Sequence, residues 1–307
     1  MKTNNLKGSL ILCTAALIWG LAFVAQAGAA EKVPSFTFNA LRSFIGALAL
    51  LVFWAMLNIK EKKPFFPKDK NGKKTYLKSA VVCGVCLAIS MNLQQFGIAA
   101  YPNEGVAKEA RSGFLTALYV ILVPIFSVLL RKKISPFVLL GGFVAIVGIY
   151  ILCLGGGFED IYLGDILVFC CAISFALHIM AVDKYVGFTG GVKLSIMQFA
   201  VTGIISTILA LIFDTVYLHY IIEATPQILY LGIMSSGVAY TLQIVGQKYA
   251  EPAVASITMS LESVFAALGG VVVSGNWLHP NELLGCTIVF IAIIIAQIPE
   301  FFKNKNA

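Results

Sequence analysis

The residues of this chain that could carry out chemistry are a few ionisable side chains set inside long apolar stretches. Glu262 lies about ten residues into one such stretch, Arg42 about eight residues into a second, and His178 about fifteen residues into a third. Inside a lipid bilayer, a charged side chain costs at least about 2.5–3.5 kcal/mol on insertion scales. An ionisable residue at such a depth is therefore a candidate for ligand binding or proton transfer.

Each of these three side chains also has a structural interpretation. Glu262 lies near the middle of its stretch, where its carboxyl group must be either hydrogen-bonded to a partner or protonated, and the second state is what a proton-coupling group requires. Arg42 has a long stem that can reach the membrane surface, so it is either a contact for a ligand or counter-ion, or an anchor at the interface. His178 is either a packed core residue or a proton-exchanging group.

Uncharged polar and aromatic residues form a second set of candidates. Gln94 and Gln243 lie at opposite depths in two similar segments, and they are predicted either to form two alternating gates or to join helices through hydrogen bonds. Trp19, Tyr119 and Tyr240 are predicted either to line a ligand cavity or to pack between helices and at the membrane interface.

Several kinds of catalytic and metal centre are not predicted. The seven cysteines lie in apolar stretches, and Cys83-x-x-Cys86 has no second pair or nearby histidine, so buried thiols are expected and no metal site. No phosphate-binding Gly-Lys motif is present, and no cofactor is expected. Ser112 and His178 differ in depth by roughly 15 Å, too far for a nucleophile and its base. No catalytic residue is therefore predicted, and the chain is not expected to be an enzyme.

These side chains are positioned by ten apolar stretches. A helix needs roughly 20 apolar residues to cross a hydrocarbon core about 30 Å thick. Of the residues, 59% are hydrophobic and 12% charged, with a mean hydropathy of +0.89. The apolar runs are continuous, which argues against the alternating strands of a β-barrel. The sequence therefore predicts an all-α membrane protein with ten transmembrane helices, at 8–28, 34–57, 77–98, 107–130, 136–154, 163–183, 192–213, 227–247, 253–274 and 280–299.

Lysine and arginine are distributed unevenly between the connecting segments. If the N-terminus is cytoplasmic, 18 of the 22 Lys and Arg residues fall on the cytoplasmic side. Short basic loops stay in the cytoplasm, so both termini are predicted to lie there, in a multi-pass protein of the cell (inner) membrane. The net charge of +7 then reflects topology and anionic lipid headgroups, and no nucleic-acid partner is expected. Asp165 and Asp183, near the two ends of the segment 163–183, are expected to be solvated, with a role in gating as the alternative.

Three matches in the same order indicate an internal duplication. Residues 8–21 match 164–177, with Gly8 opposite Gly164; Leu93-Gln94-x-x-Gly97 matches Leu242-Gln243-x-x-Gly246; and residues 134–141 match 278–285. The chain is therefore divided into a first five-helix unit at 1–155 and a second at 156–307. Because five is odd, the second unit enters the membrane from the opposite side, which predicts two inverted repeats.

Two segments carry a family resemblance. Residues 260–268, Ser-Leu-Glu-Ser-Val-Phe-Ala-Ala-Leu, resemble the Leu-Glu-Pro-Val-Phe-Ala signature of the EamA family in the drug/metabolite transporter superfamily. Residues 112–124 and Trp19-Gly20 are also similar to that family. The resemblance covers nearly the whole chain as two EamA-type units, and it places Glu262 at the glutamate of the signature.

The sequence departs from the family pattern at two places. Ser263 stands where the signature usually has proline, and Arg131-Lys132 and Gly275-Asn276 replace the Gly-Glu that commonly ends the fourth helix of a unit. These departures weaken the transfer of substrate specificity more than the transfer of fold.

The function that we expect is secondary active transport by alternating access, with the two inverted units exchanging conformations. The resemblance implies an exporter of small polar metabolites such as amino acids, driven by proton coupling or by substrate exchange. The alternatives are a membrane channel and an intramembrane hydrolase. The expected partners are a small-molecule substrate, the lipid bilayer and, with proton coupling, protons; the oligomeric state is not predicted.

Overall fold

The computed structural model describes residues 5–59, 64–102, 108–132, 134–154, 161–274 and 280–303, and the regular elements in these ranges are helices. In chain order they are α1 (Asn5–Ala30), α2 (Ser35–Asn58), α3 (Lys70–Ala99), α4 (Lys108–Ala117), α5 (Tyr119–Leu129), α6 (Pro136–Leu154), α7 (Leu163–Thr189), α8 (Gly191–Phe213), α9 (Leu218–Glu223), α10 (Thr225–Tyr230), the π-helix η1 (Leu231–Ala239), α11 (Tyr240–Tyr249), α12 (Pro252–Met259), α13 (Leu261–Ser274) and α14 (Pro280–Lys303).

Seven helical segments in the described residues are long and apolar enough to cross a membrane. They are Leu6–Ala30, Ser35–Asn58, Lys70–Ala99, Arg111–Leu129, Leu163–Thr189, Gly191–Phe213 and Thr225–Tyr249. Each coincides with one of the ten predicted spans. Three shorter apolar helices, Pro136–Ile151, Pro252–Ala266 and Leu283–Ala296, overlap the remaining three predicted spans. The all-helical prediction is confirmed, whereas the count of ten spans stays a prediction.

Three of the helical rods are interrupted near their middle. One breaks at Leu118, between α4 and α5, shortly before Pro124, whose missing N–H cannot bond within the helix. Another breaks at Ser260, between α12 and α13, where Ser256, Thr258 and Ser260 each donate a hydroxyl hydrogen bond to a backbone carbonyl three or four residues earlier. Such bonds compete with the helix and bend it. The third rod passes through η1, between α10 and α11.

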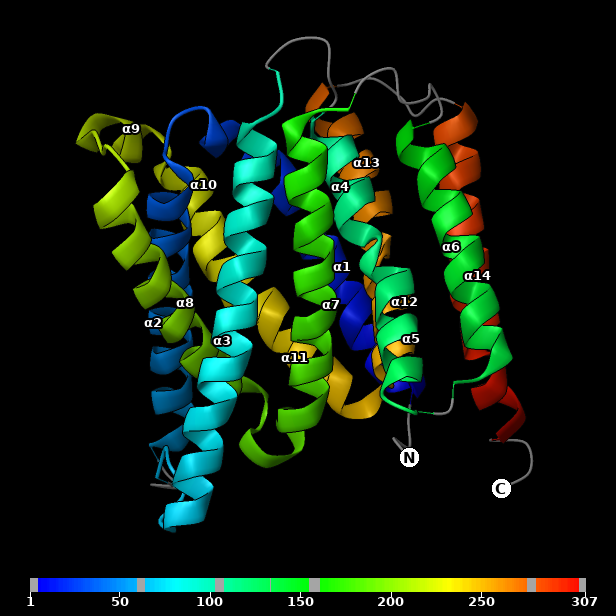
Figure 1. Cartoon of the computed structure of the whole chain (residues 1–307), viewed down its shortest axis with the longest axis horizontal. Helices are drawn as coiled ribbons and strands as arrows, with labels where there is room; N and C mark the ends of the chain where they lie inside the picture. The colour runs from blue at the N-terminus through cyan, green and yellow to red at the C-terminus, as the bar shows by residue number, and fades with distance from the viewer. Residues whose placement is uncertain are drawn as a thin grey trace.

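The helices pack in pairs that combine the two halves of the chain. The helix α6 lies along α14 at one edge of the bundle, while α3 lies along α7 and α2 along α8 (Figure 1). The helix α1 packs against α11, α12 and α13. Segments far apart in sequence therefore lie side by side throughout the bundle.

Two of these pairs cross at opposed glycines. A side chain at Gly164 on α7 would come within 2.7 Å of the carbonyl oxygen of Gly97 on α3. A side chain at Gly8 on α1 would likewise come within 2.9 Å of the carbonyl oxygen of Gly246 on α11. The backbones of each pair touch at these points, as small residues allow in membrane helices. These four glycines are among those that the sequence comparison aligned between the two units.

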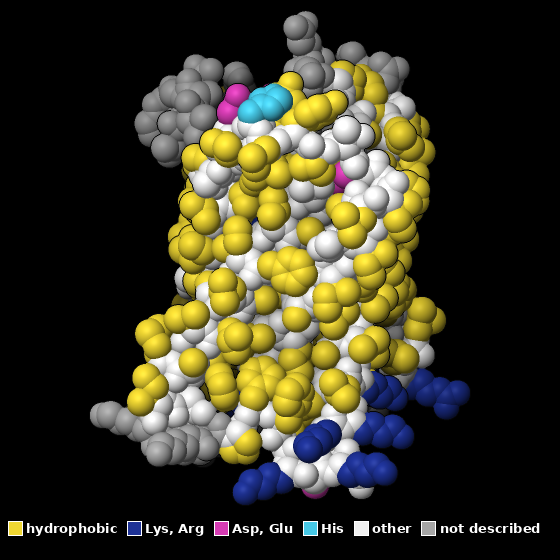
Figure 2. Space-filling view, turned by 90° about the vertical axis from the view of Figure 1, so that its left-hand side faces the viewer, with side chains coloured by type: hydrophobic (Ala, Val, Ile, Leu, Met, Phe, Trp, Pro, Cys, Tyr) yellow, Lys and Arg dark blue, Asp and Glu magenta, His cyan; other side chains and the backbone are white. Residues whose placement is uncertain are grey.

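The two ends of the bundle differ in charge. The helix α1 begins and α14 ends at the same end, the lower one in Figure 1, which we call the terminal end; the opposite end is called the far end. Figure 2 shows a broad hydrophobic band, with Lys and Arg side chains gathered at its lower border. At the start of α3, the exposed lysines of this end are Lys68, Lys70, Lys73, Lys74 and Lys78.

Candidate functional site

A cavity of about 480 Å³ lies inside the bundle, between helices of both halves. Seven of the eight predicted site residues line it, namely Trp19, Arg42, Gln94, Tyr119, Tyr240, Gln243 and Glu262. The other lining residues are Ala22, Phe23, Gln26, Thr116, Phe175, Ile179, Ser235 and Met259. The structure thus brings together side chains that the sequence scatters over more than two hundred positions.

The two helix breaks position an acid and a phenol against each other in the cavity wall. Tyr119 is the first residue of α5, directly after the break at Leu118, and Glu262 follows the break at Ser260 by two residues. The Tyr119 hydroxyl donates a hydrogen bond of 2.8 Å to Oε1 of Glu262, and both side chains are buried. This bond links the first half of the chain to the second. The sequence pointed to both residues but not to their pairing.

Arg42 is held inside the cavity wall. The residue is 2% exposed, so its guanidinium does not extend to the surface. Its Nη1 donates a hydrogen bond of 2.9 Å to Oε1 of Gln26 on α1. The Cζ atom of its guanidinium lies 5.6 Å from the ring centre of Phe38. Its Nε has no hydrogen-bond partner, and Arg42 forms no ion pair with the residues that the structure describes. The interface-anchor interpretation does not fit this placement.

Aromatic rings form another part of the wall. Trp19 meets Tyr240 edge to face at 4.7 Å between ring centres, and Tyr240 meets Phe199 at 5.3 Å. His178 does not line the cavity, because it lies behind Tyr240 at 6.2 Å. Its Nε2 shares a hydrogen bond of 3.0 Å with Oε1 of Gln198, and the ring is fully buried. This placement favours the packing interpretation of His178.

The two glutamines differ in their hydrogen bonding. Gln94 donates from Nε2 to Oγ1 of Thr116 at 3.2 Å, which joins α3 to α4 beside the cavity. Gln243 on α11 is buried, and its Oε1 has no hydrogen-bond partner. The indole Nε1 of Trp19 is also without a partner. Together with Nε of Arg42, the cavity residues therefore offer two donors and one acceptor that the described residues leave unused.

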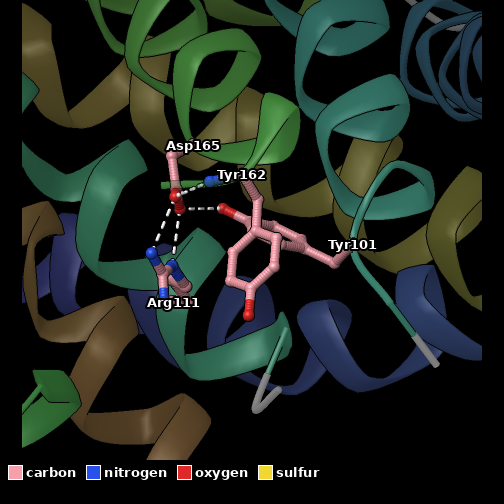
Figure 3. Close-up of polar contacts among 4 residues, drawn as sticks. All are labelled: Tyr101, Arg111, Tyr162 and Asp165. Atoms are coloured by element: carbon pink, nitrogen blue, oxygen red, sulfur yellow. Dashed lines mark hydrogen bonds and ion pairs between the residues drawn. The ribbon is translucent and has the colours of Figure 1, made fainter. Parts of the chain in front are cut away.

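A buried ion pair lies at the far end of three helices that line the cavity (Figure 3). Arg111 on α4 donates from Nε to Oδ1 of Asp165 on α7 at 2.6 Å and from Nη2 to Oδ2 at 2.7 Å. The Tyr101 hydroxyl, just beyond α3, donates to Oδ1 at 2.8 Å, and the backbone N–H of Tyr162 donates to Oδ2 at 2.8 Å. We call these four residues the far-end network.

The far-end network is buried and tightly connected. Arg111 and Asp165 are only 8% and 7% exposed, and the Arg111 guanidinium lies 4.9 Å from the ring of Tyr162. Burial and the hydrogen bond to Asp165 raise the pKa of Tyr101, so its phenol stays protonated and donates. The expectation that Asp165 is solvated was therefore wrong. Asp183, near the other end of α7, is only partly buried and accepts from Lys132 Nζ at 2.8 Å.

Two segments of the chain, residues 6–154 and 162–297, each match the EamA-like transporter family. The chain belongs to this family. As an EamA-like protein with several apolar helices long enough to span a bilayer, it is an integral, multi-pass membrane transporter. The family also belongs to the drug/metabolite transporter superfamily, so the resemblance seen in the sequence is confirmed.

Curated relatives of this EamA-like chain carry the same general description. A protein of Archaeoglobus fulgidus is 28% identical over 96% of this chain and 87% of its own length, and one of Clostridium kluyveri is 26% identical over 86% and 82%. One of Bacillus subtilis is 21% identical over 94% of both chains. Each is named as an uncharacterized transporter.

One solved crystal structure has the same fold as this EamA-like chain. It aligns with a TM-score of 0.75 over 95% of this chain and 96% of its own, at 17% sequence identity. This likeness concerns the fold alone.

Proposed function

We propose that this EamA-like protein is a secondary transporter that exports small polar metabolites such as amino acids by alternating access. The observation that carries the proposal is the cavity inside the apolar bundle, which holds one buried acid, Glu262, and one buried base, Arg42, from different halves of the chain. Charged groups are costly at this depth and mark ligand and ion pathways in membrane proteins. Unused donors and acceptors at Trp19, Arg42 and Gln243 support a polar ligand.

The proposal includes two inverted five-helix units, at residues 1–155 and 156–307, and ten spans. The crossings of α1 with α11 at Gly8 and Gly246, and of α7 with α3 at Gly164 and Gly97, support this division. Gly8 corresponds to Gly164, and Gly97 to Gly246, so each crossing is the counterpart of the other. A two-fold axis in the membrane plane exchanges such crossings between opposite ends of the bundle. The same relation lets an inward-open state have an outward-open counterpart.

Alternating access also requires contacts that close one end at a time. At the far end, α4 is tied to α7 through Arg111 and Asp165, and to the end of α1 through Lys108 and Glu31 at 2.7 Å. At the terminal end, Lys132 and Asp183 tie the end of α5 to α7. We propose that the far-end network separates whenever the cavity opens on its side. Because a buried ion pair is costly to break, we expect the far-end network to be either fully formed or fully separated.

Glu262 is the proposed coupling group. Its hydrogen bond to Tyr119 joins α13 to α5 next to the two helix breaks, so a change in its protonation would act on both interrupted rods. Proton coupling and substrate exchange remain the two candidate energy sources. The terminal end is proposed to be cytoplasmic, which places its exposed lysines on the side that the positive-inside rule favours.

Reconstitution into liposomes tests the function. Liposomes that contain the purified protein are loaded with a mixture of unlabelled amino acids. Uptake of labelled amino acids by counterflow is then followed with and without an imposed pH gradient. Saturable counterflow that empty liposomes lack is the expected result. An ungated, ohmic current would instead indicate a channel, and chemical conversion of the added compounds an intramembrane enzyme; either result without counterflow would contradict the proposal.

A further inference from the structure

The guanidinium of Arg42 is a buried cation without a counter-ion among the described residues. Its one hydrogen-bond acceptor, Oε1 of Gln26, is a neutral amide oxygen. Gln26 is itself buried, and its backbone carbonyl accepts from Nε2 of Gln95 at 3.2 Å, which fixes α1 against α3 beside the arginine. Nε of Arg42 remains without a partner, although the residue is 2% exposed and lines the cavity.

A buried charge is costly unless it is paired, and leaving one uncompensated is strongly destabilising. A guanidinium presents five N–H donors in a planar fork, which matches the two oxygens of a carboxylate. The Nη1 bond to Gln26 leaves other donors of this fork available. An anion arriving through the cavity would therefore satisfy both the charge and the free donors of Arg42.

We propose that Arg42 binds the carboxylate of the substrate, an inference that rests on the proposed transport function and names the ligand chemistry of its site. Glu262 also lines the cavity, but its carboxyl group accepts from Tyr119 and forms no ion pair with Arg42 among the described residues. The lining residues include one cationic side chain, which balances one negative charge and so fits a monocarboxylate better than a phosphate dianion. The free Nε1 of Trp19 supplies a further donor.

The test compares ligands that differ only at the carboxylate. Binding of L-leucine, L-phenylalanine, L-leucinamide and L-phenylalaninamide is measured by the ligand-induced shift in thermal unfolding of the purified protein, and each compound is then used in counterflow. We expect the wild type to bind the acids about tenfold or more tightly than the amides. In Arg42→Gln, acid binding should weaken by about tenfold or more, whereas amide binding should change less than about threefold.

Two further variants separate the role of Arg42 from general effects of charge. Arg42→Lys keeps the charge but not the planar fork, so part of the preference for acids should remain. Lys73→Gln removes an exposed charge from the start of α3 and should leave binding unchanged. If Arg42→Gln fails to fold, the wild-type comparison of acids with amides still decides.

Three results would overturn the assignment: equal binding of acids and amides by the wild type, an equal loss for both in Arg42→Gln, or no binding of either amino acid by the wild type. Arg42-dependent binding of the acids without counterflow would support the carboxylate site and contradict the transport function.

Discussion

At the scale of single residues, Glu262 is the group whose protonation can be separated from its packing. Glutamine has nearly the same shape and keeps an acceptor oxygen for the Tyr119 hydroxyl, which now lies 2.8 Å from Oε1 of Glu262. We therefore expect Glu262→Gln to insert and fold normally but to lose the pH dependence of counterflow, because an amide does not titrate. The measurement is counterflow in proteoliposomes from acid to neutral pH. Unchanged transport with an unchanged pH profile would eliminate Glu262 as the coupling group.

Tyr119→Phe changes the same contact from the opposite side. The ring stays, but Glu262 loses its hydrogen-bond donor inside the bundle. A buried acceptor left unsatisfied costs about 1–3 kcal/mol, so this variant should unfold at a lower temperature than both the wild type and Glu262→Gln. Thermal unfolding of the detergent-solubilised protein measures the order. A Tyr119→Phe protein as stable as the wild type would mean that the bond contributes little to the fold.

At the scale of elements, the two ion pairs of α7 provide a matched comparison. Both side chains of the Arg111–Asp165 pair are 10% exposed, whereas in the Lys132–Asp183 pair Lys132 is 44% and Asp183 13% exposed. Removing one partner of a buried pair costs about 3–5 kcal/mol, and a pair open to solvent contributes about 0–1 kcal/mol. Asp165→Asn should therefore lower the unfolding temperature much more than Asp183→Asn.

Asp165→Asn also reports on access to the cavity. Thr116 lines the cavity, so a cysteine at this position reports on access to it. If the far-end network closes the bundle, Asp165→Asn should speed the reaction of this cysteine with a membrane-impermeant thiol reagent added on the far side. The background for this experiment has its native cysteines replaced. Equal labelling rates in the proteins with and without Asp165→Asn would show that the far-end network does not control access to the cavity from the far end.

At the scale of the whole molecule, the glycine crossings predict an equivalence between distant positions. An alanine at Gly8 would meet the Cβ of Ala250 at 2.8 Å, and one at Gly164 would meet the carbonyl oxygen of Gly97 at 2.7 Å. Both substitutions overpack a helix crossing, which typically costs about 1–3 kcal/mol. Gly187 on α7 has open space around it, so Gly187→Ala is the control and should be neutral or slightly stabilising. A large loss at one crossing and none at the other would contradict the proposed equivalence of the units.

Depth along a helix was readable from the sequence, and it selected most of the cavity residues. A polar side chain deep in an apolar span is costly, so Arg42, Gln94 and Glu262 stood out by position alone. The rotation of each helix about its axis was not readable, because the spans are apolar on nearly all sides. His178 was therefore predicted as a site residue alongside Arg42 and Glu262. In the structure it instead packs against Tyr240 and is hydrogen-bonded to Gln198.

Contacts between distant segments were beyond the sequence for the same reason. Asp165 lies near the end of its span, where depth predicts contact with water, but Arg111 on α4 and Tyr101 just beyond α3 pack against it and bury it. The pairing of Glu262 with Tyr119 depends on two helix breaks that face each other. The available sequence signals were Pro124, which lies inside α5 shortly after the first break, and the alternating Ser256, Thr258 and Ser260 at the second.

The orientation of the molecule is testable through its two chemically different ends. Exposed lysines at the start of α3 mark the terminal end, whereas the exposed His219 of α9 belongs to the far end (Figure 1). Since basic segments are retained in the cytoplasm, Lys73→Cys should react with an impermeant thiol reagent only after the cells are permeabilised, while His219→Cys should react in intact cells. The protein without an added cysteine provides the background. Labelling of both positions from the same side would rule out the proposed topology, because an odd number of crossings separates them in the proposed order of spans.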